Sequence, residues 1–347
     1  MKLIIFIFSI LIVVIFGNTA IFAEEPSEIW TSLSDMPERR TSSAAVTLDD
    51  KIYVIGGLNN SDEGTKTVFV YEPNNDKWSS STPMPIPLHH LGAAANQGKI
   101  YVVGGYADKW IPTNSLLIYD PETNSWSTGK PMPTPRGALT VEFISGKLYA
   151  VGGFSNVTHS TVEQYDPNTN SWMEKKEMPT PREHLASAVL DDKMYTIGGY
   201  AKEKGNLVAN ERYDPTLDSW EILESLPTPK NGLTASTLDG AVFVFGGEDL
   251  TKTFDETHAY IPEEGWLEFM PLPVPRQGLF STMLGNTIYV MGGGINTDFS
   301  YSNLNHAYNN TAIPEFDMII LILGLAIVMV ILITRFKIKK TPIEFQT

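Results

Sequence analysis

The octets YDPETNSW (residues 119–126) and YDPNTNSW (residues 165–172) stand 46 residues apart and differ at one position. Each begins with tyrosine, ends with tryptophan and holds Asp-Pro and Asn between them. Proline restricts φ, and Asp and Asn side chains bond to nearby backbone groups, so the octet predicts a tight turn between two strands. Its repetition indicates one structural unit that the chain uses more than once.

Two markers count these units. Tryptophans recur at steps of 46 or 48 residues, and only Trp110 lies outside the series Trp30, Trp78, Trp126, Trp172, Trp220 and Trp266. A glycine pair begins 26 residues after each of them and ends at Gly57, Gly105, Gly153, Gly199, Gly247 and Gly293. Periods of this length with paired glycines are typical of β-propellers, whose four-stranded blades bury their faces only against neighbouring blades.

We expect four strands in each unit, named a to d in chain order. Strand a is small and apolar, strand b is aromatic and ends in the glycine pair, strand c ends in tyrosine, and strand d holds the tryptophan. In an antiparallel blade the b–c loop and the d–a link emerge on one face. The b–c loops vary most in length, and variable loops on a rigid frame commonly carry binding sites.

The order of glycine pair, tyrosine, tryptophan and Pro-Arg resembles the kelch repeat over about residues 28–308. This resemblance implies an all-β fold, a six-bladed kelch β-propeller. No seventh tryptophan follows the strand expected at 305–308, and no glycine pair precedes Trp30. We therefore expect the N-terminal strand to complete the sixth blade.

Both ends of the chain predict targeting to a membrane. Residues 1–23 combine a lysine, an apolar run and small residues, which is typical of a signal peptide; an uncleaved anchor helix is the alternative. Residues 318–334 carry no charge and precede a basic tail at 335–347, which predicts one transmembrane helix with a cytoplasmic tail. The propeller at 24–308 is then extracytoplasmic, at the cell membrane.

The linker at 309–317 contains Pro314-Glu315-Phe316 ahead of the apolar segment and the basic cluster. This order resembles the C-terminal sorting signals that archaeosortases process, and the resemblance implies cleavage and transfer to a membrane lipid. A plain membrane anchor explains the same segment, and Asp317 stands where such signals often have glycine.

Three Asn-x-Ser/Thr sequons are candidates for glycosylation. They begin at Asn59, Asn156 and Asn309. We expect all three in loops, where an exported protein accepts glycans.

The composition limits the classes of function. The chain has no cysteine, so an exported propeller relies on its core and not on disulfides. Galactose oxidases share this propeller type, but their copper site needs a Cys-Tyr crosslink, which cannot form here. With 25 basic and 40 acidic residues the surface repels phosphate backbones, which argues against a nucleic-acid partner. We expect no metal or other cofactor, and a monomeric propeller.

Cations recur where strand a begins. They are Arg40, Arg136, Arg182, Lys230 and Arg276, with Leu88 in the second unit. These positions predict a ring around the mouth of the central channel. The cations either bond to carbonyl and carboxylate groups of the blades or form an anion pocket for a carboxylate or an acidic sugar.

The next two positions hold His89 and His90 in the second unit and Glu183 and His184 in the fourth. Histidine beside a carboxylate suits proton transfer, so His184 and Glu183 are the candidate catalytic residues, while His89 and His90 are candidates for ligand binding. Because the two units are not neighbours, we expect no compact metal site. Polar residues at a strand start also occur without any function.

Aromatic residues directly follow three of the glycine pairs. They are Tyr106, Phe154 and Tyr200, and Trp110 lies in the same loop as Tyr106. These side chains would form a stacking platform for a sugar or a partner's side chains, or each would pin its own loop to the next blade. Pinning is favoured for all but Trp110, for which both roles stay open.

We interpret the chain as a membrane-anchored, extracytoplasmic module that binds a protein or a glycan through the b–c loops and the ring of cations. The alternative is a carbohydrate-active epimerase or mutarotase of acidic sugars. Sialic acid mutarotase propellers resemble this architecture, although their catalytic residues do not map onto these positions. A structural component of the cell surface is a third hypothesis. The residues favour binding over catalysis.

Overall fold

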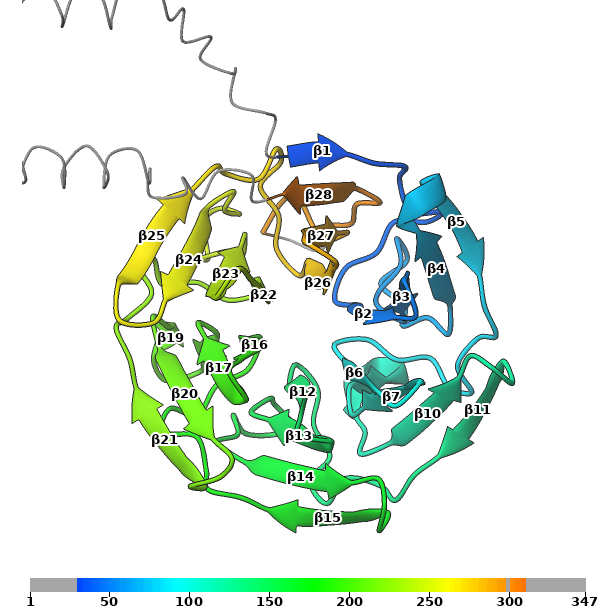
Figure 1. Cartoon of the computed structure of the whole chain (residues 1–347), viewed down its shortest axis with the longest axis horizontal. Helices are drawn as coiled ribbons and strands as arrows, with labels where there is room; N and C mark the ends of the chain where they lie inside the picture. Colours follow the sequence, from blue (N-terminus) through cyan, green and yellow to red (C-terminus); the bar gives the residue numbers. More distant parts are fainter. Residues whose placement is uncertain (1–29, 298–299, 310–347) are drawn as a thin grey trace, which may run out of the picture. The chain divides into compact units, whose positions relative to one another are not determined.

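The computed structural model describes residues 30–297 and 300–309, which form one propeller (Figure 1). Six four-stranded antiparallel sheets surround a central channel, as the repeats predicted. No helix among the described residues is long and apolar enough to cross a membrane. The predicted signal peptide, sorting motif, transmembrane helix and basic tail lie outside the described residues.

Blades 1 to 3 each run from the channel to the rim in chain order. Blade 1 contains β2 (Ala44–Leu48), β3 (Lys51–Ile55), β4 (Val68–Glu72) and β5 (Lys77–Ser80), with the 3-10 turn η1 (Pro73–Asn75) between its last two strands. Blade 2 contains β6 (Gly92–Asn96), β7 (Lys99–Val103), β10 (Leu116–Asp120) and β11 (Ser125–Thr128). Blade 3 contains β12 (Thr140–Ile144), β13 (Lys147–Val151), β14 (Val162–Asp166) and β15 (Ser171–Glu174).

Blades 4 and 5 repeat this order, and blade 6 joins the two ends of the propeller. Blade 4 contains β16 (Ala186–Leu190), β17 (Lys193–Ile197), β20 (Asn210–Asp214) and β21 (Ser219–Ile222). Blade 5 contains β22 (Thr234–Leu238), β23 (Ala241–Phe245), β24 (Thr257–Ile261) and β25 (Gly265–Phe269). Blade 6 contains β26 (Phe280–Leu284), β27 (Thr287–Met291), β28 (Asn305–Asn309) and β1 (Trp30–Ser32).

The N-terminal strand β1 closes the ring, as predicted. Trp30 pairs with Tyr308, and Ser32 pairs with His306, along an antiparallel β1–β28 ladder. The indole Nε1 of Trp30 also donates a hydrogen bond to the carbonyl of Met270 in blade 5, at 3.0 Å. The first strand of the propeller therefore supplies the outermost strand of the last blade.

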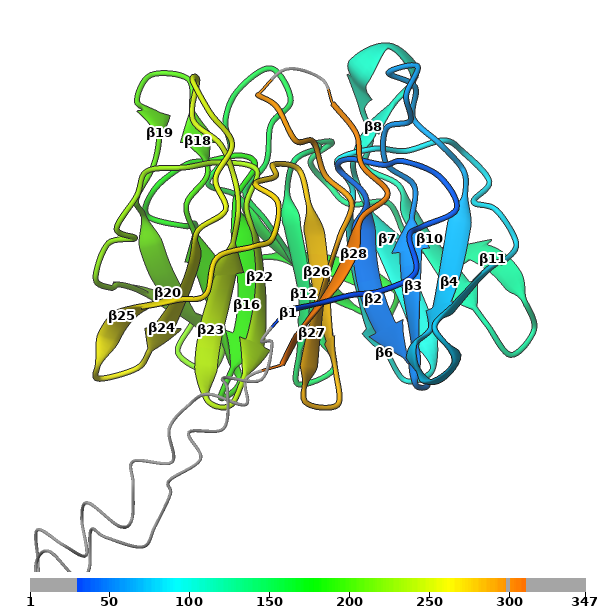
Figure 2. The ribbon, with the colours of Figure 1, turned by 90° about the horizontal axis from the view of Figure 1, so that it is seen from above.

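The two faces of the disc differ in their connections (Figure 2). One face, which we call the loop face, carries the b–c loops and the d–a links. Two of these loops form short hairpins, one from β8 (Tyr106–Ala107), η2 (Asp108–Trp110) and β9 (Ile111–Pro112), the other from β18 (Tyr200–Ala201) and β19 (Gly205–Asn206). The opposite face, the hairpin face, carries the tight a–b and c–d turns.

The repeated octet is a c–d turn that also ties one blade to the next. In blade 3, Asn170 has a left-handed φ of 47°, and its Oδ1 accepts hydrogen bonds from the Tyr165 hydroxyl at 2.8 Å and from the Lys130 backbone N–H of blade 2 at 2.7 Å. The indole of Trp172 donates to the Lys130 carbonyl at 2.7 Å. Corresponding tyrosine bonds join Tyr71 to Asp76, Tyr119 to Asn124 and Tyr213 to Asp218.

The glycine pairs lie where adjacent blades approach most closely. Gly105 donates its backbone N–H to the Arg136 carbonyl of blade 3 at 3.0 Å. Gly104 has a φ of 63°, and a Cβ placed on it would lie 2.6 Å from that same carbonyl oxygen. Only glycine combines this backbone conformation with this contact.

A closed ring of backbone hydrogen bonds surrounds the channel at the loop face. Each member donates its N–H to the carbonyl of the corresponding residue in the preceding blade, at 2.8 to 3.0 Å. All six members have a positive φ between 49° and 61°. They are Ser42, His90, Ala138, His184, Gly232 and Gly278. We call this set the axial ring.

The apolar core lies between neighbouring blades and not inside one sheet. One cluster combines Val46, Tyr53 and Ile55 of blade 1 with Ile100 and Val102 of blade 2. Aromatic side chains of strands c and d add further packing area, because each buries roughly 150 to 250 Å². Stability therefore depends on each blade having neighbours on both sides.

The sequons differ in their surroundings. Asn59 and Asn156 lie in b–c loops, as predicted. The prediction of a loop is wrong for Asn309, which ends strand β28. Its Oδ1 accepts a hydrogen bond from the Thr287 hydroxyl at 2.5 Å, so the side chain is engaged in the sheet. Glycosylation at the other two positions stays a prediction.

Candidate functional site

The cations at the strand a starts point into the blades. The guanidinium of Arg136 is fully buried and donates to Glu163 at 2.5 Å, to the Ala150 carbonyl at 3.0 Å and to the Gly152 carbonyl at 2.8 Å. Burial lowers the pKa of Arg136, and the carboxylate of Glu163 offsets part of that shift. Arg136 thus has its partners within its own blade.

The other cations of this set are also buried and bonded to side chains or carbonyls of their own blades. Arg182 pairs with Glu211 at 2.7 Å, Lys230 pairs with Glu256 at 2.7 Å, Arg276 contacts the Gly292 carbonyl and His306, and Arg40 contacts Glu38 and Thr67. Leu88 occupies the remaining position and is equally buried. Of the two roles left open by the sequence, this geometry favours the structural one over an exposed anion pocket.

The histidines form a compact cluster at the mouth of the channel on the loop face. The Nδ1 atoms of His89 and His90 lie 2.6 Å apart. The ring centres of His90 and His184 lie 5.0 Å apart in an edge-to-face arrangement. His184 Nδ1 lies 3.5 Å from the Glu183 carboxylate. Blades 2 and 4 are not adjacent, yet the structure brings their histidines together across the axis.

The electrostatics of His89 and His90 favour binding over proton transfer by these two rings. Burial lowers the pKa of His89 to about 4 and that of His90 well below its ordinary value, and the neighbouring histidines lower the pKa of His90 further. Both rings are then neutral at pH 7, and one ring N–H donates to the other ring's free nitrogen. A base with a pKa of about 4 is poorly matched to catalysis at neutral pH.

Backbone strain does not single out these histidines. His90 and His184 have φ values of 51° and 49°, but Ser42 and Ala138 share this conformation at the corresponding positions. The left-handed backbone therefore belongs to the axial ring in every blade. What distinguishes blades 2 and 4 is the imidazole that each projects at the channel mouth.

The aromatic residues of the second b–c loop surround the histidines. The centre of the Trp110 ring lies 4.4 Å from the ring centre of His89, 5.2 Å from that of His90 and 5.4 Å from that of Tyr106. The exposed fraction of Trp110 is 43%. Tyr106 is buried, and its hydroxyl donates to the Phe154 carbonyl of blade 3 at 3.1 Å. Pinning thus describes Tyr106, whereas Trp110 presents a ring to solvent. Phe154 and Tyr200 are half-buried.

Exposed apolar side chains stand at the tips of the b–c loops in four blades. They are Trp110 and Ile111 in blade 2, Val157 in blade 3, Leu250 in blade 5 and Ile295 in blade 6, with exposed fractions from 43% to 86%. They stand on the same face of the propeller as the mouth of the channel. Sequence reasoning identified the loops but did not single out these aliphatic tips.

The described residues offer no group of three His, Cys, Asp or Glu side chains arranged to hold a metal ion. The convergence of His90 and His184 was missed because blades 2 and 4 were treated as distant from each other. Alignment of the repeats puts both residues at the same position of their units, but it does not give the short distance between those positions at the channel mouth.

The chain is similar to known proteins in its repeats and in its fold. Residues 22–199, just over half of the 347 residues, match the family described as KLHDC2/KLHL20/DRC7 Kelch-repeats domain, and residues 181–227 match the Kelch motif. The solved structure described as "Structure of YjhT" has a TM-score of 0.70 and 18% sequence identity, and the match covers 79% of this chain and 95% of that one. At this identity the likeness shows the fold alone. No curated protein matches the chain.

Proposed function

Because the chain belongs to the kelch-repeat family, whose propellers commonly mediate protein interactions, we propose that it is an extracytoplasmic module that binds a protein partner through its loop face. The observation that carries this proposal is the set of exposed apolar tips on the b–c loops of blades 2, 3, 5 and 6. Exposed apolar side chains that gather on one face of a protein are typical anchors of surfaces that bind other proteins.

The geometry supports binding more than an enzyme that acts on acidic sugars. Such an enzyme needs an accessible cation to hold the carboxylate of its substrate, whereas Arg136, Arg182 and Lys230 are buried and paired with glutamates. The remaining candidates, His184 and Glu183, contact each other at the mouth. Their position suits polar recognition between the apolar tips.

We further propose that the propeller stands outside the cell membrane and is anchored through the segment predicted at 318–334. Within the propeller, β28 ends at Asn309, which pairs with Thr287 beside the a–b turn of blade 6. The described chain therefore ends at the hairpin face. The described end of the propeller and the proposed contact surface therefore belong to opposite faces of the propeller.

A glycan is the second candidate ligand, and Trp110 favours it. Its exposed ring stands beside the neutral imidazoles of His89 and His90. An aromatic face with adjacent hydrogen-bonding groups suits a sugar ring. The two ligand classes differ in what they require, because a glycan needs Trp110 and not the aliphatic tips of blades 5 and 6.

The test uses the full chain on cells, with a photo-crosslinking side chain at Leu250 and, as the matched control, at Leu217. Both leucines are highly exposed, at 86% and 72%, but Leu217 lies in a c–d turn on the hairpin face. We expect a defined protein to crosslink from Leu250 only. Affinity for that purified protein should fall at least about tenfold in Trp110→Ala and in Leu250→Asp.

The control variant Leu217→Asp should leave the affinity within about twofold, since rim changes away from the contact cost little. Equal weakening by the Leu217 and Leu250 variants would place the contact elsewhere. Binding of a glycan that needs Trp110 but not Leu250 would favour the second candidate and argue against the first.

A further inference from the structure

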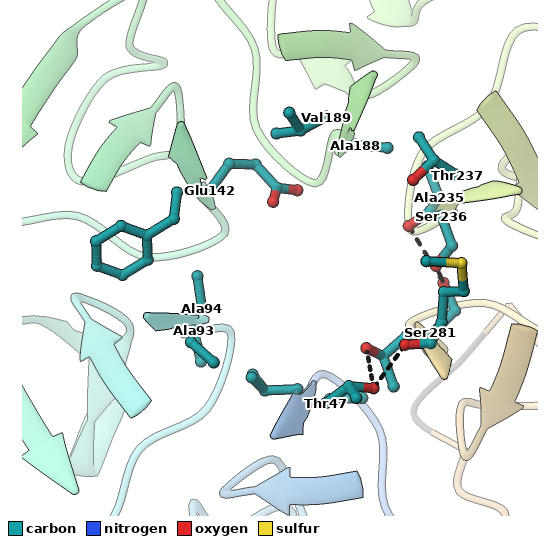
Figure 3. A pocket seen from close by; sticks show the side chains of 16 residues that line it. Thr47, Ala93, Ala94, Glu142, Ala188, Val189, Ala235, Ser236, Thr237 and Ser281 are labelled. Carbon is teal, nitrogen blue, oxygen red and sulfur yellow. Dashed lines mark hydrogen bonds between the residues drawn. The ribbon is translucent and has the colours of Figure 1, made fainter. Parts of the chain in front are cut away.

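The central channel contains one ionisable side chain that neither the scaffold nor the loop face uses. A cavity of about 290 Å³ is lined by strand a residues of all six blades, and Glu142 on β12 is the only ionisable group among its described lining residues (Figure 3). Corresponding positions in the adjacent blades hold Ala94 and Ala188. Their small side chains leave room for a glutamate that projects into the channel.

The Glu142 carboxyl is held from one side only. Ser187 Oγ donates to its Oε1 at 2.8 Å, and Ser187 in turn contacts the hydroxyl of Thr140. Figure 3 shows the carboxyl group directed into the opening. Burial raises the pKa of Glu142 to about 7, and no charged side chain of the described chain contributes to the shift. Among the described residues, the carboxylate therefore lacks a cationic partner.

The facing wall supplies hydrogen-bond acceptors. Thr47 and Thr282 join their hydroxyls at 3.0 Å, and Ser236 and Ser281 join theirs at 2.9 Å. Each hydroxyl oxygen carries two lone pairs and therefore has capacity to accept a further donor. The walls on either side of Glu142 are apolar and consist of alanines of β6 and β16 with Phe143. The channel thus combines one acid, several acceptors and an apolar lining.

The charge around the hairpin end of the channel has the same sign as Glu142. Exposed aspartates occupy three of the a–b turns, and they are Asp49, Asp50, Asp191, Asp192 and Asp239. The lysines that follow four of the turns bond outward to acids of strand c: Lys51 to Glu72, Lys99 to Asp120, Lys147 to Asp166 and Lys193 to Asp214. Acid-lined openings concentrate cations, so this end of the channel attracts positively charged ligands.

We propose that the channel binds a small primary alkylammonium ion, which enters from the hairpin face and donates its N–H groups to Glu142 and to the hydroxyls opposite. A divalent metal ion fits less well, because Ca²⁺ and Mg²⁺ take several oxygen ligands and this cavity offers a single carboxylate. The cavity volume and the alanine walls accommodate a short alkyl chain. A bare metal ion would leave most of this cavity unfilled. This site is independent of the loop face.

The test is a calorimetric titration of the full chain with butylammonium, with 1-butanol as the neutral control of the same shape. An alkylammonium stays protonated to about pH 10, so only the protein titrates below that pH. With a Glu142 pKa of about 7, we expect binding at about pH 8.5 that weakens about 30-fold at about pH 5.5, as the carboxyl takes up a proton. Butanol should bind at neither pH.

Glu142→Gln should abolish butylammonium binding, because it keeps the size and the Ser187 hydrogen bond but removes the charge. Glu174→Gln, which removes one charge from the outer strand β15, should bind like the wild type. A carboxyl titration by NMR of the unaltered chain avoids any folding defect and should show that butylammonium lowers the pKa of Glu142. Four results would each overturn the proposal. Butanol binds as well as butylammonium, potassium displaces butylammonium at matched ionic strength, Glu142→Gln binds butylammonium like the wild type, or butylammonium does not bind at all. None of these results bears on partner binding at the loop face.

Discussion

At the scale of single residues, buried charge has opposite consequences in two parts of this propeller. Arg136 and Glu163 are both fully buried and satisfy each other, so neither side chain is available to a ligand. Glu142 has no such counterpart in the part of the chain that the structure describes, and its carboxyl faces a cavity. The difference lies in the partner, because an ion pair costs desolvation on both sides but removes the need for an external counter-ion.

Replacement of Arg136 by alanine tests its structural role. The change leaves the buried carboxylate of Glu163 without its cation, and we expect the free energy of unfolding to fall by about 3 to 5 kcal/mol. Arg39→Ala, at an exposed neighbour of Arg40, should change it by less than about 0.5 kcal/mol. Denaturant titration of both variants measures the difference. Similar values for the two would contradict a structural role for Arg136.

At the scale of elements, the c–d turn converts a short sequence into a contact between blades. The residue before the serine of the octet takes a left-handed conformation, and its side-chain oxygen receives both the tyrosine hydroxyl and a backbone N–H of the preceding blade. Asn and Asp tolerate this conformation and supply the acceptor. The chain uses Asn124 and Asn170 in blades 2 and 3 and Asp76 and Asp218 in blades 1 and 4.

Asn170 offers a direct test of this turn. Asn170→Ala removes both hydrogen bonds and places alanine at a φ of 47°, so we expect a loss of about 1 to 3 kcal/mol in the free energy of unfolding. Asn170→Asp should change it little, because aspartate occupies the same position in two other blades. Thermal and denaturant unfolding of the two variants gives the comparison. If alanine is tolerated as well as aspartate, the turn is held by its backbone alone.

At the scale of the whole molecule, stability depends on closure of the ring. Each blade buries its faces against two neighbours, and β1 is the strand that completes blade 6. Without β1, strand β28 becomes an exposed sheet edge, and blade 5 loses the contact of Trp30 with Met270. Exposed edges promote pairing with other chains.

Deletion of residues 27–35 tests this closure. We expect a lower Tm and association that increases with protein concentration, measured by calorimetry and light scattering. Deletion of residues 1–26, which keeps β1, is the matched control and should lack both effects. A truncated chain that melts like this control would show that the ring closes without its N-terminal strand.

The sequence by itself determined the number of blades, the order of the strands and the closure by β1. These follow from local chemistry, since the turn residues, the glycine pairs and the tryptophans recur at nearly constant spacing. It also identified the loop that carries Trp110 and the histidines that lie at the channel mouth. Trp110 and the histidines could be singled out because the other copies of the repeat have different residues at these positions.

Only the tertiary structure decided which side chains meet. His90 and His184 come from blades that are not adjacent, yet their rings lie 5.0 Å apart, and Glu142 shares a cavity with residues of all six blades. Strand a lies next to the propeller axis, where the distance between any two blades is short. Burial of Arg136 and Arg182 likewise depends on Glu163 and Glu211, which lie 27 and 29 residues further along the chain. The spacing of the repeats along the chain specifies the ring of six blades. The distance of each side chain from the propeller axis decides which residues of other blades it contacts.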